Sequence, residues 1–240
     1  MKANWMVACA TGAALIIAGQ MMRVNASGES EVKGTVKFAG TAPKPTRVDM
    51  SDDPKCAKLH PGGASVASIV TDGSGGLDDT VVYVSAGVQG QNFDPPAQPV
   101  TLQQKGCLYE PRVIAVQAGQ KVDVVNADTT THNIHPIPKN NREWNKSQPP
   151  GVPIEESFAR EEIAIPVKCN VHPWMKGYIA VFKHPYFSVT GKDGSFDIKG
   201  LPPGTYTLQA WHEGLDPVTQ QITVGSGETK SLDFTMKAGS

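Results

Sequence analysis

A stretch in the second half of the chain carries three side chains that bind metals. Cys169, His172 and Met175 supply a thiolate, an imidazole and a thioether within seven residues. Copper sites that transfer electrons use two imidazoles and one thiolate in a trigonal arrangement, with a weak axial methionine. The missing imidazole can come from His132, which follows a strand-like stretch ending at Asn126 and a Thr-rich turn. The four side chains therefore predict a mononuclear copper site.

Each of these side chains also has a simpler interpretation. Cys169 could be an inert buried thiol, Met175 a core residue and His132 a hydrogen-bonded turn residue. Their order and spacing favour the copper site. A binuclear copper site would need a second cysteine on the loop, a multicopper oxidase would need several His-x-His pairs, and a structural zinc site would need more Cys or His. The chain has six histidines and no convincing hydrolase triad or phosphate-binding glycine loop, so we expect no enzyme.

The elements that must position this set are predicted to be short strands. The chain is rich in glycine (24) and proline (19), and no amphipathic helical pattern follows residue 30, which together predict an all-β fold. The residues 41–65 and 136–153 are expected to be loops, and Pro166 suggests that its strand lies at an edge or bends. The predicted strands are 32–40, 66–70, 80–84, 100–103, 112–116, 122–126, one within 154–165, 177–182, 187–190, 196–198, 205–211, 219–224 and 230–236.

Residues 98–182 resemble the cupredoxins, the small blue-copper proteins. The resemblance rests on Asn126, on the His132-Asn133 pair, and on the Cys-x2-His-x2-Met loop followed by Lys176-Gly177 and a strand. The loop spacing is similar to that of short-loop members such as amicyanin. The resemblance implies a Greek-key β-sandwich with one copper ion that alternates between Cu(I) and Cu(II).

The resemblance also implies a role for each residue of the site. His132, Cys169 and His172 would be the equatorial ligands, and Met175 the axial ligand. The backbone N–H of Asn133 would donate a hydrogen bond to the Cys169 sulfur and so tune the reduction potential. The outer edge of His172, flanked by Pro173 and Trp174, would be the electron portal at which partners dock.

Residues 187–236 resemble the carboxypeptidase regulatory-like, or transthyretin-like, β-sandwich. The segments 190–196 (TGKDGSF) and 201–206 (LPPGTY) carry this resemblance. The opening strands of that family are missing there, but suitable strands occur at 32–40 and 77–86. We therefore expect a small second sandwich, formed by 27–97 and 183–240, into which the copper-binding region 98–182 is inserted. The alternative is two domains in series, with 27–97 as an elaborated start of the copper-binding domain.

The N-terminus is predicted to be a secretory signal peptide. Lys2 is followed by an apolar run over 5–19, and small residues at 24 and 26 mark a cleavage site after Ala26. The alternative is an uncleaved membrane anchor. We expect a periplasmic or secreted protein without membrane insertion after cleavage. The formal net charge of -1 gives no sign of nucleic-acid binding.

Three cysteines remain after the signal peptide. In an oxidising compartment, Cys56 and Cys107 are expected to form a disulfide, which leaves Cys169 free for the metal. The alternative is a separate metal site formed by Cys56, His60 and Cys107. His135 and His212 are expected to be surface or turn residues, although either could bind a second metal.

These expectations describe a carrier of single electrons between redox proteins. Its partners could be a cytochrome or a dehydrogenase. The alternatives are a copper storage or delivery protein, and a structural cell-envelope β-sandwich that has lost its metal.

Overall fold

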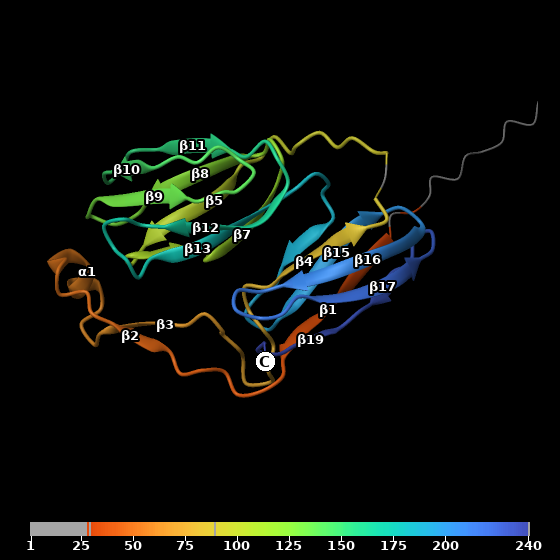
Figure 1. Cartoon of the computed structure of the whole chain (residues 1–240), viewed down its shortest axis with the longest axis horizontal. Coiled ribbons are helices and arrows are strands. Elements are labelled where there is room, and N and C mark those ends of the chain that lie inside the picture. Colours follow the sequence, from red (N-terminus) through yellow and green to blue (C-terminus); the bar gives the residue numbers. More distant parts are fainter. Residues whose placement is uncertain (1–27, 29, 89, 240) are drawn as a thin grey trace, which may run out of the picture.

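The computed structural model of this chain describes residues 28, 30–88 and 90–239. Nearly all of its regular structure is β-strand, as the sequence predicts (Figure 1). The predicted signal peptide lies outside the described residues. Within the part of the chain that the structure describes, no helix is long and apolar enough to cross a membrane.

Two sheets form a sandwich that we call the central sandwich. Along its strands, buried apolar residues alternate with outward-facing polar residues. The buried residues form a core that includes Leu102, Ile134, Ile165 and Ile179. The first sheet has the strand order β10 (Lys146–Gln148), β9 (His132–Pro136), β12 (Glu162–Lys168), β13 (Lys176–Phe182) and β7 (Val113–Gln117). The second has the order β11 (Ile154–Ser157), β8 (Lys121–Asn126), β5 (Val100–Lys105) and β6 (Leu108–Glu110).

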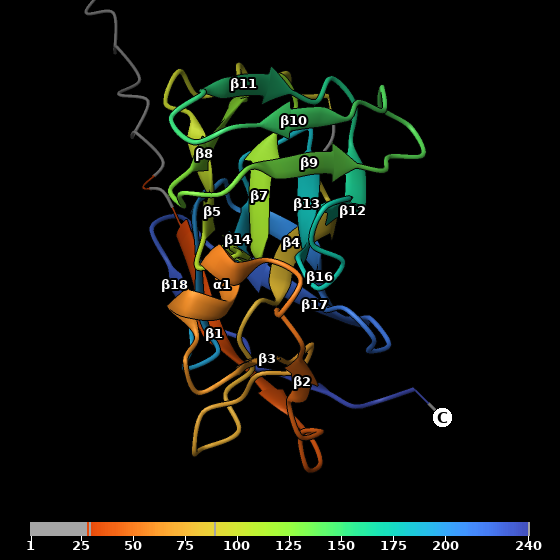
Figure 2. The same ribbon diagram turned by 90° about the vertical axis from the view of Figure 1, so that its left-hand side faces the viewer.

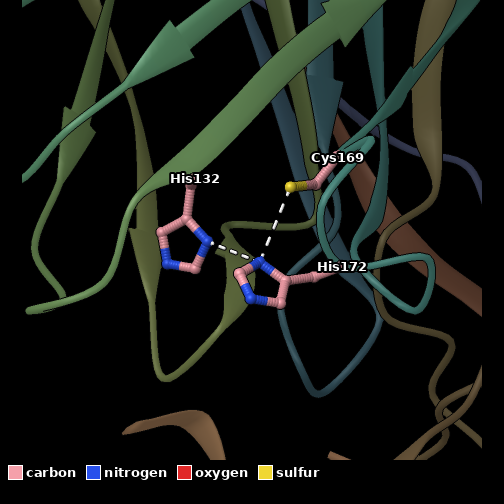
Figure 3. Close-up of side chains that lie close together, drawn as sticks. All are labelled: His132, Cys169 and His172. Atoms are coloured by element: carbon pink, nitrogen blue, oxygen red, sulfur yellow. Dashed lines mark hydrogen bonds between the residues drawn. The ribbon is translucent and has the colours of Figure 1, made fainter. Parts of the chain in front are cut away.

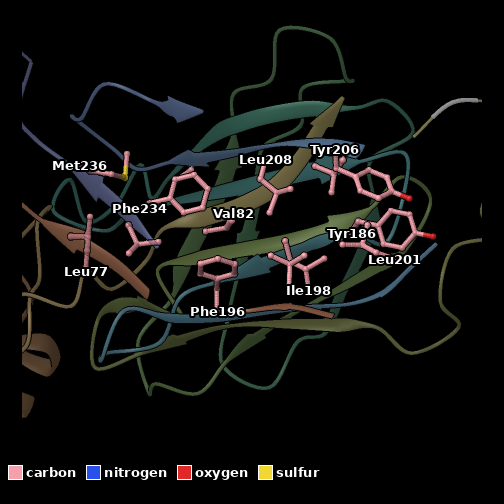
Figure 4. Close-up of a cluster of buried hydrophobic side chains, with 14 of the residues drawn as sticks. Leu77, Val82, Tyr186, Phe196, Ile198, Leu201, Tyr206, Leu208, Phe234 and Met236 are labelled. Atoms are coloured by element: carbon pink, nitrogen blue, oxygen red, sulfur yellow. The ribbon is translucent and has the colours of Figure 1, made fainter. Parts of the chain in front are cut away.

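Two further sheets form the outer sandwich, whose core is shown in Figure 4. Aromatic and aliphatic side chains such as Phe196, Phe234 and Leu208 fill the space between them. One sheet has the order β15 (Ser195–Leu201), β1 (Ser30–Phe38) and β18 (Thr229–Ser231), with β19 (Phe234–Met236) also paired to β1. The other has the order β14 (Phe187–Val189), β4 (Val81–Ala86), β16 (Gly204–Trp211) and β17 (Val218–Val224).

The outer sandwich is built from both ends of the described chain. β1 pairs with β15, β18 and β19, and β4 pairs with β14 and β16. All strands of the central sandwich come between β4 and β14 in the sequence. This pairing is the one that the inserted arrangement requires. A separate apolar cluster that includes Val81, Val113 and Phe182 packs the two sandwiches together.

The connection between β1 and β4 leaves the outer sandwich and reaches one end of the central sandwich (Figures 1 and 2). We call residues 46–66 the cap; it contains β2 (Thr46–Val48), α1 (Pro54–Leu59) and β3 (Ala64–Val66). A disulfide between Cys56 of α1 and Cys107, in the turn between β5 and β6, ties the cap to the central sandwich. The cap has its own small core of Met50, Ala64 and the disulfide sulfurs, against which Trp174 packs.

The cap corrects the expectation that 41–65 is a loop and that the chain has no helix. Asp53 caps α1, because its side chain accepts hydrogen bonds from the backbone N–H groups of Lys55 and Cys56. Pro54 occupies the first turn, where its missing N–H costs no hydrogen bond. Local capping and the disulfide together hold a helix that is too short to be stable alone.

Smaller differences concern individual strands. β12 is not an edge strand, because it pairs with both β9 and β13; the bend occurs at an irregularity between Glu162 and Ile165, where Ala164 has φ of 64°. β3 ends at residue 66, so the strand expected over 66–70 is absent from that described segment. The sequence did not predict β2, β6 or β10, and the strand expected over 230–236 is divided into β18 and β19.

Candidate metal centre

Three of the four predicted ligand side chains converge at the end of the central sandwich that faces the cap. The Nδ1 atoms of His132 and His172 are 3.0 Å apart, and the Cys169 sulfur lies 3.7 Å from the His172 Nδ1 (Figure 3). One donor atom from each of the three residues lies within 4.8 Å of the others. All three side chains are at most 2 % exposed. The arrangement therefore presents two imidazole nitrogens and one thiol to a common point, away from bulk water.

Neighbouring strands bring these residues together. His132 is the first residue of β9, which pairs with β12, and Cys169 directly follows β12. Met175 directly precedes β13, which is the other neighbour of β12. The loop between β12 and β13 is closed by two backbone hydrogen bonds, from Cys169 N to Met175 O at 3.2 Å and from Met175 N to His172 O at 2.9 Å. The short loop thus holds Cys169, His172 and Met175 on one tight turn.

Asn133 holds the same loop from the neighbouring strand. Its backbone N–H donates to the Cys169 sulfur at 3.3 Å, which is the contact expected from the sequence. Its side-chain oxygen accepts a hydrogen bond from the backbone N–H of Asn170 at 2.9 Å. A donor aimed at the sulfur of a metal-binding cysteine is a contact that tunes the properties of the bound metal.

The Met175 side chain is fully buried and belongs to the same apolar cluster as Cys169 and Ile134. A buried thioether on the loop that carries Cys169 and His172 suits the role of a weak axial ligand. Its apolar surroundings also keep water from the site.

Asp128 fixes the orientation of His132. The Nε2 of His132 lies 2.8 Å from a carboxylate oxygen of Asp128. The same carboxylate accepts hydrogen bonds from the backbone N–H groups of Gly106 and Cys107, both at 2.8 Å. Burial is the largest influence on His132 and lowers its pKa, although the hydrogen bond to Asp128 opposes this. A neutral imidazole whose Nε2 carries the proton leaves Nδ1 free to bind a metal.

The cap supplies the corresponding contact to His172. The Nε2 of His172 lies 3.0 Å from Oδ2 of Asp53, at the start of α1, and 3.6 Å from the sulfur of Cys56. His172 is therefore 1 % exposed. This corrects the expectation that the outer edge of His172 forms an open portal: a segment about 120 positions earlier in the chain covers it. Pro173, by contrast, is exposed, and Trp174 is partly exposed.

Asp53 is held in a complete set of hydrogen bonds. One oxygen caps α1, and the other accepts hydrogen bonds from the Thr130 hydroxyl at 2.7 Å and from His172. Burial alone would raise the pKa of Asp53, but the hydrogen bonds from Thr130, His172 and the backbone of Lys55 and Cys56 lower it to about 2. The carboxylate is therefore ionised and can act only as an acceptor.

The structure also shows the contacts of the other cysteines, of His60 and of Trp174. Cys56 and Cys107 form the predicted disulfide and Cys169 is free, so the alternative metal site with His60 is excluded. The His60 Nε2 instead lies 2.8 Å from the carbonyl oxygen of Gly106. Trp174 packs its ring against His172, with ring centroids 5.1 Å apart, and its indole N–H donates to the Cys107 carbonyl oxygen.

The other histidines in question lie outside the candidate centre. His135 is in β9, with its ring nitrogens near Glu143 and Asn170. His212 is buried beyond the end of β16, and its Nδ1 lies 2.7 Å from the backbone oxygen of Glu213. Among the described residues, neither belongs to a group of three potential metal-binding side chains.

The donor set fits copper. Two imidazoles and one thiolate in a buried site, with a thioether nearby, combine borderline and soft ligands that suit both Cu(I) and Cu(II). Each histidine has its outer nitrogen on a carboxylate, which is the common way to hold a metal-binding imidazole in one tautomer. The residues present therefore match the cofactor predicted from the sequence.

Neither carboxylate was among the site residues predicted from the sequence. Asp53 precedes Pro54, and a capping residue followed by proline is a recognisable helix start. That signal could have located α1 but not its contact with His172. Asp128 lies in the turn between β8 and β9, four residues before His132. Nothing in that spacing alone distinguishes it from an ordinary turn residue.

A comparison with protein families gives a match in the C-terminal part of the chain. The carboxypeptidase regulatory-like domain family matches residues 179–237, which includes the stretch for which the sequence suggested this resemblance. No curated protein matches the chain.

Several solved structures are similar to part of the chain. A copper-containing nitrite reductase from Thermus scotoductus SA-01 is 24% identical, with a TM-score of 0.34, over 41% of this chain and 25% of its own; the match thus spans a quarter of that enzyme. A purple cupredoxin from Nitrosopumilus maritimus is 23% identical, with a TM-score of 0.30, over 34% of this chain and 98% of its own. An oxidised amicyanin mutant is 21% identical, with a TM-score of 0.31, over 35% of this chain and 81% of its own.

Proposed function

We propose that this chain is a mononuclear copper protein that carries single electrons between redox proteins. His132, Cys169 and His172 would hold the metal as equatorial ligands, with Met175 as the axial ligand. The observation that carries the proposal is that His132, His172 and Cys169 bring one donor atom each to within 4.8 Å of the others, while the Cys169 sulfur accepts the Asn133 N–H. Bound copper would supply the one-electron couple.

The site favours electron transfer over storage or delivery of copper. A delivery site must release its metal to a partner, whereas here the four side chains are at most 2 % exposed and the cap covers His172. Neighbouring strands and a closed loop also fix the ligand positions, so little rearrangement is needed between oxidation states. We assign no reaction on an organic substrate to the chain.

Because His172 is covered, the proposed docking surface lies on the adjacent part of the loop. Pro173 and Val171 are exposed, with Val171 at 54 %, and Trp174 packs against the His172 ring. A redox protein partner, such as a cytochrome or a dehydrogenase, would dock on this small apolar rim. The Cys56–Cys107 disulfide supports an oxidising compartment, the periplasm or the cell exterior.

The first experiment is a visible absorption spectrum after addition of Cu(II), with Cys169→Ser as the control. We expect an intense thiolate-to-copper band in the wild type and its complete loss in the variant. Bound copper without such a band in the wild type would favour delivery or storage. Failure to bind copper would favour the alternative of a structural cell-envelope β-sandwich that has lost its metal.

A further inference from the structure

Asp53 is contributed to the candidate metal centre by a part of the chain that precedes the whole central sandwich. It lies at the start of α1, in the connection between two strands of the outer sandwich. Its Oδ2 lies 3.0 Å from the Nε2 of His172, on the side of the ring opposite the Nδ1 that faces Cys169. The two sides of one imidazole are thus held by two distant segments of the chain.

The hydrogen bonds of Asp53 determine which nitrogen of His172 carries its proton. The carboxylate can only accept, so a hydrogen bond with Nε2 requires the proton to be on Nε2. In the neutral ring Nδ1 then keeps its lone pair. Nδ1 is also the nitrogen that lies near His132 and Cys169.

We propose that Asp53 is a positioning residue for the metal centre, whose carboxylate selects the His172 tautomer that leaves Nδ1 available to the metal. The identity of the metal rests on the function proposed above, but the tautomer does not. The negative charge also lies close to the centre and favours Cu(II) over Cu(I), so Asp53 lowers the reduction potential.

Three further contacts keep the carboxylate in place. The capping hydrogen bonds to Lys55 N and Cys56 N fix its other oxygen, and the Thr130 hydroxyl donates to the same oxygen as His172. The Cys56–Cys107 disulfide ties α1 to the central sandwich three residues further on. The cap can therefore hold Asp53 against His172 without help from a bound metal.

Asp53→Asn is the most informative variant. Asparagine caps helices as well as aspartate does, so α1 should remain. Capping requires the asparagine oxygen to face the N–H groups of Lys55 and Cys56, so its NH2 group faces Nε2 of His172. This group donates where the carboxylate accepted, which favours the Nδ1-protonated ring. Ala57→Gly is the matched control, because it weakens α1 and leaves the carboxylate unchanged. If Asp53→Asn does not fold, Asp53→Ser replaces it as the test variant. Serine also caps helices but is too short to reach His172.

The first readout uses the metal-free protein. Long-range ¹H–¹⁵N correlation spectra of the histidine rings distinguish the two tautomers. We expect Nε2 of His172 to carry a proton in the wild type and in Ala57→Gly, and we expect this proton to move to Nδ1 in Asp53→Asn. The same tautomer in the wild type and in Asp53→Asn would overturn the proposal. Titration of free thiols verifies that the disulfide is intact in each variant.

The second readout is the reduction potential of the copper-loaded protein. We expect Asp53→Asn to lose about 10-fold to 100-fold in Cu(II) affinity. A tenfold loss confined to Cu(II) raises the potential by about 59 mV for one electron. Equal potentials in the wild type and Asp53→Asn would contradict the electrostatic role of Asp53. A wild type without a thiolate-to-copper band would instead refute the proposed function, while the metal-free spectra would still decide the tautomer.

Discussion

The two sandwiches bury different kinds of side chain. The outer sandwich encloses an aliphatic and aromatic cluster that includes Phe196, Leu208 and Phe234. The central sandwich has an apolar core too, but at the end that faces the cap it buries a connected set of polar groups, including Asn126, Asp128, Gln148 and the two histidines. We infer that apolar packing makes the outer sandwich a stable support for the cap, whereas the central sandwich uses buried hydrogen bonds to orient metal-binding groups.

Asn126, Asp128 and Gln148 are linked through hydrogen bonds in the central sandwich. The Asn126 amide donates to the backbone oxygens of Thr130 and Gln148, and its oxygen accepts the N–H of Asp128. The Gln148 amide donates in turn to the backbone oxygens of Val124 and Val152. Networks of this kind favour one arrangement, because leaving any member without a partner is costly in a buried site.

The largest effect should come from the outer core. Phe234 is fully buried, and Phe234→Ala should lower the free energy of unfolding by about 3–5 kcal/mol because of lost burial and the cavity left behind. Chemical denaturation measures this loss. The thiolate-to-copper band of the folded variant should be unchanged. A changed band would show that the outer core also shapes the metal centre. The proposed division of roles between the two sandwiches would then be wrong.

A smaller effect on stability should accompany a clear effect on the site when Asn126 is replaced. Asn126→Ala removes the hydrogen bonds of the Asn126 side chain with the N–H of Asp128 and with the carbonyl groups of Thr130 and Gln148, which should lower the free energy of unfolding by about 1–3 kcal/mol. Because Asp128 contacts His132, the absorption or EPR spectrum of the copper form should also change.

The control for that variant is Thr223→Val in the outer sandwich, where Thr223 pairs with Thr205 through an exposed hydroxyl contact. We expect a change in unfolding free energy within about 0.5 kcal/mol and no spectral change. An unaltered spectrum of the copper form of Asn126→Ala would show that the polar network does not influence the metal centre.

The smallest effect concerns acid stability. Hydrogen bonds from the backbone of Lys139, Asn140 and Asn141 and from the Asn141 side chain outweigh the effect of burial, and they lower the pKa of Glu162 from its usual 4.5. The folded protein therefore resists protonation that the unfolded chain accepts, so this stabilisation is present above about pH 4.5 and is lost as the pH falls through the lowered pKa.

Glu162→Gln should flatten the dependence of unfolding free energy on pH below about 4.5, as measured by denaturation at several pH values. Asp193→Asn in the outer sandwich should have less effect. Hydrogen bonds from Ser195 lower the pKa of Asp193 as well, but this carboxylate is exposed to solvent. Equal effects would mean that the buried carboxylate of the central sandwich has no special role in acid stability.

The sequence predicted the elements that local patterns specify. Alternating apolar residues identified most of the long strands, and the Cys169–Met175 spacing identified the ligand loop, because a short loop between paired strands is a local feature. The cysteine count, together with the requirement for one free thiol, also predicted the disulfide correctly.

The sequence could not predict contacts between distant segments. The covering of His172 depends on Asp53 of the cap, 119 residues earlier. No local property of His172 indicates whether its outer edge meets water or a carboxylate. The short strands β2, β6 and β10 have three residues each, too few to show a period. Tertiary pairing, rather than propensity, decides such elements.

The position of the disulfide has a consequence for how the chain matures. The His172 ring separates two kinds of sulfur: the free Cys169 thiol lies 3.7 Å from its Nδ1, and the Cys56 sulfur of the disulfide lies 3.6 Å from its Nε2. Cys169 and the two cysteines of the disulfide allow three pairings, and thiolate attack interconverts them. A Cys169 thiolate already engaged by a metal ion cannot attack. A chain that bound its metal before oxidation would therefore be protected from a disulfide through Cys169, whereas in a chain oxidised first all three pairings would be open.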